Sequence, residues 1–164
     1  MRKQKGFSLI ELLIVVAIIL IIAAIAIPNL LRSRIAANEA SAVGSLRTIN
    51  TAEVTYASTY PDHGFTDLKT LGGVATPTTA TAAGLLDSVL GCSAGTTGAN
   101  CPKSGYNFAV TVTLGTNPPA STYSSAANPI TVDQTGKRYF FSDASGVIRF
   151  NTTAAAAATD SALQ

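Results

Sequence analysis

The hydrophobic and polar positions form three successive patterns along this chain, and the first is a nearly unbroken apolar run. Between Phe7 and Ile27 lie 21 residues whose only polar side chains are Ser8 and Glu11. As an α-helix, with a rise of about 1.5 Å per residue, this run is roughly 31 Å long. This length matches the hydrocarbon core of one lipid bilayer. The pattern therefore predicts a single transmembrane helix.

The second pattern is an amphipathic helix that continues from the first. Its apolar side chains recur at steps that place them on one side of a helix, namely Leu31, Ile35, Ala42, Leu46, Ile49, Tyr56 and Tyr60. Polar residues mostly populate the other faces, among them Arg32, Asn38, Glu39, Ser45 and Arg47. One helix from Phe7 to about Tyr60 would be roughly 80 Å long. Its second half requires a folded head to pack against.

The third pattern has a period of two and predicts β-strands. From Tyr106 to Leu114 large apolar side chains alternate with small or polar ones, as in a strand with one buried face. A weaker extended piece begins at Tyr123 and is interrupted at Asn128-Pro129, so it predicts a short or edge strand.

Two further strands and two weaker elements complete the expected fold. Residues Arg138–Ser142 and Val147–Phe150 flank a short glycine-containing segment, which predicts a β-hairpin. The apolar side chains of Ala82–Leu90 are compatible with two turns of helix, and the Thr- and Ala-rich chain after Asn151 predicts a frayed tail. The expected fold class is α+β: one long helix packed on three or four antiparallel strands.

The charge balance excludes one class of function and suggests an orientation. The chain has 11 Lys and Arg against 9 Asp and Glu, but three of the basic side chains lie within the first six residues. Without these six residues, eight basic side chains face nine acidic ones, so no basic surface typical of nucleic-acid binding remains. The positive charges before the apolar run favour a cytoplasmic amino terminus, with the rest of the chain outside.

Glu11 is the unusual residue of the apolar run. An ionised carboxylate inside hydrocarbon costs roughly 2.5–3.5 kcal/mol, and such groups are functional by default, with a cation as the natural partner. A cut after Gly6 would give Phe7 a new amino terminus one helical turn from Glu11. In a row of identical, staggered helices, the amine of one chain could then reach Glu11 of its neighbour. The apolar run thereby becomes an assembly element.

The amino-terminal third resembles a known motif. The leader MRKQK, Gly6, the segment Phe7-Ser8-Leu9-Ile10-Glu11 and the apolar run to Pro28 resemble the prepilin cleavage and methylation motif of type IV pilins and type II secretion pseudopilins. The resemblance implies that a prepilin peptidase cuts between Gly6 and Phe7 and methylates the Phe7 amine. It also implies that Glu11 neutralises the neighbouring amine during assembly, and that Pro28 marks a place where the helix bends or loosens.

Three other interpretations of this region remain open. A secretory signal would be cut after Ala26, although Glu11 interrupts the apolar region and the run is longer than the usual 7–15 residues. An unprocessed membrane anchor would leave the cost of burying Glu11 unexplained. Pro28 would simply end the anchor helix, because it lacks the amide that bonds to the carbonyl of Ala24.

Cys92 and Cys101 are the only cysteines of the chain. In an exported chain such a pair usually forms one disulfide, and closing this short loop is worth roughly 2–3 kcal/mol on the chain-entropy model. A metal site is the alternative, but the single histidine, His63, lies far away in sequence and no CxxC spacing exists.

No motif for catalysis or cofactor binding is present in the sequence. Glycine-rich phosphate loops, His-Glu metal motifs and activated nucleophiles are all missing, so we expect a protein that is not an enzyme and has no cofactor. Asp133 and Asp143 are weak candidates for Ca²⁺, which needs six to eight oxygen ligands and is bound by pseudopilins that the first third resembles. Two turn aspartates are the favoured interpretation.

These observations predict a structural subunit with three parts: a leader (1–6), a transmembrane and polymerisation segment (7–27) and a periplasmic or extracellular head (28–164). The subunit is stored in the inner membrane and polymerises into a surface filament. The resemblance implies identical subunits, membrane lipid, a prepilin peptidase, an assembly ATPase and an inner-membrane platform protein as partners. It implies adhesion, twitching motility or DNA uptake as roles. The alternatives are a type II secretion pseudopilin, a minor pilin, or a filament-borne module whose head binds a surface, DNA or a phage.

Overall fold

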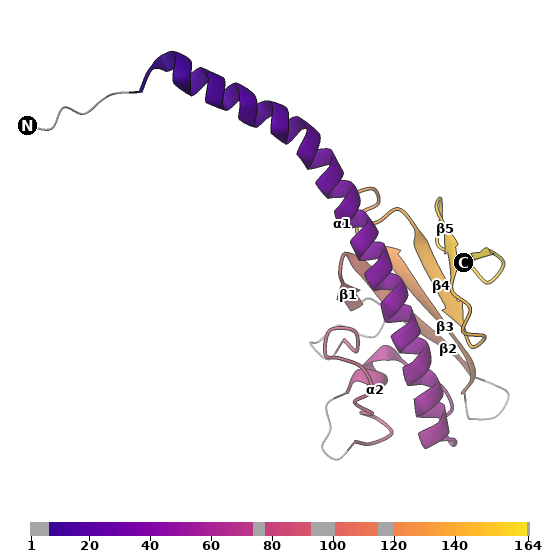
Figure 1. Cartoon of the computed structure of the whole chain (residues 1–164). Helices are drawn as coiled ribbons and strands as arrows, with labels where there is room; N and C mark the ends of the chain where they lie inside the picture. The colour runs from indigo at the N-terminus through magenta and orange to yellow at the C-terminus, as the bar shows by residue number, and fades with distance from the viewer. Residues whose placement is uncertain (1–6, 74–77, 93–100, 115–119, 164) are drawn as a thin grey trace, which may run out of the picture. The chain divides into compact units, whose positions relative to one another are not determined.

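The computed structural model describes residues 7–73, 78–92, 101–114 and 120–163. The chain divides into two compact units, Met1–Arg34 and Ile35–Gln164. Helix α1 (Leu9–Thr59) contributes to both units, and the other described elements belong to the second (Figure 1). The expected continuous helix from the apolar run into the head is confirmed, with bounds within two residues of those predicted.

The second unit combines the end of α1, a short helix and an antiparallel sheet. Within the described residues the sheet has six strands whose spatial order follows the chain order. After α2 (Leu68–Gly72) they are β1 (Cys101–Lys103), β2 (Tyr106–Leu114), β3 (Ala120–Pro129), β4 (Tyr139–Asp143), β5 (Arg149–Asn151) and β6 (Ser161–Ala162). The predicted α+β class is confirmed, and the short β1 and β6 extend the sheet beyond the three or four strands expected.

The hydrophobic core lies between the second half of α1 and the sheet (Figure 1). Ala42, Leu46 and Ile49 of α1 are fully buried and share one cluster with Phe108 of β2 and Phe140 of β4. Their spacing of three and four residues puts them on one face of the helix, so burial of this face fixes α1 onto the sheet.

Two polar positions of α1 differ from the sequence prediction. Glu39 and Ser45 were expected on the exposed faces, but they are only 7% and 6% exposed. Glu39 Oε1 accepts hydrogen bonds from the amides of Lys137 and Arg138 at 2.9 and 3.2 Å, and Glu39 Oε2 accepts one from Arg138 Nε at 2.8 Å. These three donors compensate the loss of hydration, so the carboxylate can lie on the packed face.

Strand β3 is also different from the expected edge strand. It is ten residues long and pairs with β2 on one side and β4 on the other. Its fully buried residues include Ser125 and Ala127, which are small, and Ser125 Oγ donates to the carbonyl of Ser142 on β4 at 3.3 Å. Asn50 of α1 donates to Ser142 Oγ at 2.8 Å. The small side chains on these central strands allow α1 to pack close to the sheet. This packing outweighs the low strand propensity of these residues.

Residues 82–90 do not form the predicted helix. The amides of Ala83 and Leu85 donate to the carbonyls of Thr70 and Leu71 at 2.9 and 2.7 Å, so they are not used for helical hydrogen bonds. The following turn crosses α2 where Gly91 meets Gly72, and a Cβ atom added to either glycine would lie 2.3 Å from the Cα atom of the other. Pairing with α2 therefore replaces the local helix.

The carboxyl-terminal region agrees with the predicted hairpin but not with a frayed tail. Strands β4 and β5 pair antiparallel, and β6 then pairs with β5. Asp160 holds the connection between β5 and β6 in place. Its carboxylate accepts hydrogen bonds from the side-chain amide of Asn151 at 3.2 Å and from the backbone amide of Ala157 at 2.8 Å. The Leu163 amide also donates to the Ile148 carbonyl at 2.8 Å.

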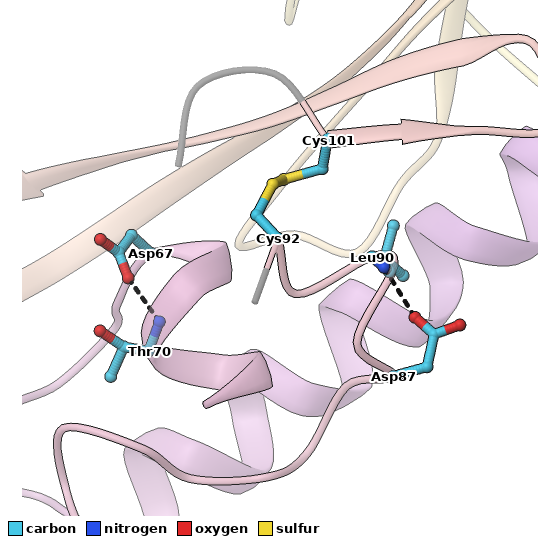
Figure 2. The surroundings of a disulfide bond; sticks show 6 residues. All are labelled: Asp67, Thr70, Asp87, Leu90, Cys92 and Cys101. Carbon is cyan, nitrogen blue, oxygen red and sulfur yellow. Dashed lines mark hydrogen bonds between the residues drawn. A yellow bond between two sulfur atoms is a disulfide. The ribbon is translucent and has the colours of Figure 1, made fainter. Parts of the chain in front are cut away.

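The predicted disulfide between Cys92 and Cys101 is present, with Cα atoms 5.4 Å apart. Figure 2 shows it beside two turns whose first residue is an aspartate: Asp67 and Asp87 each accept a hydrogen bond from the amide three residues later, at 2.7 and 2.8 Å. Asp87 also forms an ion pair with Lys103 at 2.8 Å. The segment between the two cysteines lies outside the described residues.

We expect Glu39→Ala to lower the free energy of unfolding by about 2–3 kcal/mol, because the change leaves two amides and a partly exposed guanidinium without their acceptor. The measurement is chemical denaturation of the full chain in detergent micelles, followed by tyrosine fluorescence since the chain has no tryptophan. The exposed acid Asp62 is the matched control, and Asp62→Ala should change stability by less than about 0.5 kcal/mol. Equal effects of the two variants would contradict the assigned role of Glu39.

Replacing Cys92 and Cys101 with serine should lower the free energy of unfolding by roughly 2–3 kcal/mol, the value for closing a short loop. The head should nevertheless remain folded, because most of its hydrophobic core, between α1 and the sheet, does not involve this bond. The same denaturation assay measures the loss. A variant as stable as the parent chain would show that the bond adds nothing to stability.

Candidate functional site

The apolar part of α1 is the most exposed hydrophobic surface of the molecule's described residues. No residue from 7 to 34 is buried, and only Ala23 is even partly covered. Phe7 is 82% exposed and Ile25 is 65% exposed. The helix contains a stretch long and apolar enough to cross a membrane. This surface therefore requires a partner that its own unit does not supply.

The start of α1 determines where Glu11 lies. Ser8 immediately precedes the helix, at the N-cap position, where serine is favoured. Its carbonyl accepts a hydrogen bond from the amide of Leu12 at 3.2 Å. Glu11 is in the first turn, where a negative charge interacts favourably with the positive end of the helix dipole. Ser8 and Glu11 have the spacing of a capping box, a signal that our sequence analysis missed. The exposed Glu11 carboxylate forms no ion pair within the described residues.

Over residues 7–27 the exposed helix is apolar on all sides except at Ser8 and Glu11. On one side, residues three and four positions apart line a shallow apolar groove, namely Leu9, Leu12, Leu13, Val16, Ala17 and Leu20. At about 100° per residue, Glu11 projects from the opposite side of the helix. Such a helix can present apolar side chains to all its neighbours and its carboxylate to only one of them.

Pro28 lies inside α1 rather than at its end. The interpretation that Pro28 merely ends the anchor helix is therefore wrong. The proline still removes the hydrogen bond that an amide at this position would donate to the Ala24 carbonyl, so the helix has one fewer backbone bond here. The weakened turn lies within the first compact unit, which ends at Arg34.

Two further candidate residues, Gly6 and His63, lie outside α1 in the sequence. Gly6 lies outside the described residues, so the geometry of the expected cleavage site is not part of the structure. His63 follows the end of α1, and its ring stacks on Tyr60 at 6.4 Å between centroids. This contact gives His63 a packing role in the loop.

The two weak calcium candidates occupy separate turns. Asp133 has a positive φ of 64° and forms an exposed ion pair with Lys137 at 3.6 Å. Asp143 ends β4, and hydrogen bonds from Ser145 lower the pKa of its carboxyl. Within the described ranges, no three His, Cys, Asp or Glu side chains form a group that could hold a metal ion. Both aspartates thus have the local roles expected of turn residues.

Comparison with known proteins finds a family match for the amino-terminal segment. Residues 1–27 match the family described as the prokaryotic N-terminal methylation motif. Over 39 residues the chain is 67% identical to the type IV wide pilus major component PilA4 of Thermus thermophilus, a match that covers 24% of this chain and 30% of the relative. Over 56 residues it is 45% identical to the type IV major pilin protein PilA of Myxococcus xanthus, covering 34% of this chain and 26% of the relative.

These similarities cover only part of the chain. The matched region spans less than a third of the length of either relative. No solved structure matches the chain significantly. The amino-terminal 27 residues match the prokaryotic N-terminal methylation motif, and they precede an α+β head in a chain that is similar over part of its length to two type IV pilins.

Proposed function

We propose that this protein is the structural subunit of a type IV pilus. It is made as a prepilin, is stored in the inner membrane with its amino terminus in the cytoplasm, and is cleaved after Gly6 and methylated on Phe7. The subunits then polymerise through the exposed part of α1. The observation that carries the proposal is that the matched methylation motif, residues 1–27, includes most of a helix segment, residues 7–34, that has no buried residue.

The physical basis of assembly is the exchange of one apolar environment for another. In the membrane, lipid chains cover residues 7–27, and in the filament the corresponding helices of other subunits cover them. Hydrophobic burial changes little between these states, so close packing and polar contacts determine the register. The groove between Leu9 and Leu20 supplies a packing surface on one side of the helix.

Glu11 supplies the polar contact on the other side. Cleavage after Gly6 creates an amine on Phe7, and a charge-assisted contact between this amine and the Glu11 carboxylate of a neighbour neutralises both groups in an apolar bundle. The exposed, unpaired state of Glu11 in the described single chain agrees with a partner supplied by another copy. The same contact fixes the axial stagger between adjacent subunits.

A major pilin is favoured over a pseudopilin or a minor pilin, because both similar proteins are named as major pilus subunits. Processing and export require a prepilin peptidase, an assembly ATPase and an inner-membrane platform protein. Shearing filaments from the cell surface and sequencing the most abundant subunit tests this assignment. A filament fraction that lacks this chain would favour the pseudopilin instead.

Replacing Gly6 with leucine should leave the full-length precursor in the membrane, because a large side chain beside the scissile bond blocks the peptidase. Mass spectrometry of the wild-type amino terminus should find Phe7 as the first residue, carrying one added methyl group. A wild-type chain that begins at Ile27 would instead support the secretory-signal interpretation, and a matured Gly6→Leu variant would place the cleavage site elsewhere.

Glu11→Gln should be processed normally but should form at least tenfold fewer surface filaments, because the variant keeps the size of the side chain and loses its charge. Immunoblots of the membrane and sheared fractions measure processing and filament yield separately. Asp62→Asn, which removes the charge of an exposed acid outside the apolar run, is the matched control and should retain near-normal yield. If Glu11→Gln formed as many filaments as the wild-type chain, the proposed role of the carboxylate in assembly would be wrong.

A further inference from the structure

Glu53 is a buried acid near the end of α1 that the assembly mechanism does not use. Its side chain is fully buried, with 0% relative exposure. Its Oε2 atom accepts a hydrogen bond from the Thr66 amide at 3.1 Å, whereas its buried Oε1 atom has no hydrogen-bond partner within the described residues. Among those residues no cation forms an ion pair with it. It differs in this respect from Glu39, the other buried carboxylate of α1, which contacts Arg138.

Among the described residues, the titratable groups that interact with Glu53 come from three parts of the chain, and none of them is positive. Tyr56 lies one turn along α1, Tyr123 belongs to β3, and Asp67 lies in the connection to α2. The Phe65–Asp67 segment covers the carboxyl group, since the Phe65 ring packs on Tyr123 with centroids 4.8 Å apart and Thr66 bonds to Glu53. Ionisation of Glu53 would therefore place two negative charges beside each other under this segment.

We propose that the protonation state of Glu53 controls how tightly the Phe65–Asp67 segment is held against α1 and β3. The protonated carboxyl keeps the segment closed, because a neutral group tolerates the absence of a cation. The ionised carboxylate requires water or a counter-ion, and hydration requires that the segment open. Asp67 also accepts a hydrogen bond from the amide of Thr70 at the start of α2, so opening of the segment extends to this short helix.

The pH range of this transition follows from the burial of the carboxyl group. The pKa of Glu53 is raised from 4.5 to about 7: burial is the main cause, the hydrogen bond from the Thr66 amide opposes the shift, and the nearby Asp67 adds a smaller increase. In the open state the carboxyl group regains its ordinary pKa. Between these two values the closed state holds a proton that the open state releases, so rising pH favours opening. Above about pH 7 both states are ionised and the effect levels off.

Amide hydrogen exchange of the full chain in detergent micelles tests the proposal. We expect the opening equilibrium of the Phe65–Asp67 segment, corrected for the intrinsic pH dependence of exchange, to rise on the order of 100-fold between pH 4.5 and 8. Glu53→Gln should abolish this rise, because glutamine keeps the shape and does not titrate. Asp67→Asn, which can still accept the Thr70 amide, should make the rise end at a lower pH. The exposed control Asp62→Asn should behave as the parent chain.

A flat opening profile in the parent chain, or an unchanged rise in Glu53→Gln, would overturn the proposal. If Glu53→Gln fails to fold, the carboxyl carbon of Glu53 in the parent chain decides the question by ¹³C NMR. A titration midpoint near 7 supports the proposal, and a midpoint near 4.5 contradicts it. Neither measurement depends on filament assembly, so the result is separate from that of the proposed function.

Discussion

The structure depends on one constraint: the first part of α1 buries none of its apolar side chains against the part of the chain that the structure describes. In water, the large apolar surface of residues 7–34 would drive uncontrolled association. A lipid bilayer and a bundle of similar helices can each cover this surface, and the length of the apolar run fits both environments. In the proposed function, the basic residues before this segment and Glu11 act on the choice between these two environments.

Three carboxylates on α1 show how one helix places the same chemical group in different settings. Glu11 is exposed in the first turn, Glu39 is buried with three donors, and Glu53 is buried with a single donor. The first has the freedom to meet another chain, and the second joins the helix to the β3–β4 connection. The third has the weakest compensation for its burial. Their environments, rather than their intrinsic chemistry, separate their roles.

The sequence predicted what depends on regular spacing. The apolar run, the stripe from Ala42 to Tyr56 and the alternation in β2 are periodic, so they indicated α1 and its sheet. The failures arose where contacts distant in sequence override local preference. Residues 82–90 pair with α2, the small residues of β3 lie under α1, and Asp160 holds the carboxyl-terminal turn closed. The two buried carboxylates, Glu39 and Glu53, lie on the same helical stripe as Ala42 and Ile49. Helical spacing alone could therefore have predicted that they are buried.

The order of the strands has a consequence for how the head folds. Each strand pairs with the one next to it in sequence, so the sheet can form by successive local pairings, which are kinetically fast. The contact between Glu39 and Arg138 instead joins residues 99 positions apart. During synthesis Glu39 precedes its partner by 99 residues, so this contact between the helix and the β3–β4 connection can form only after β1, β2 and β3 have been made.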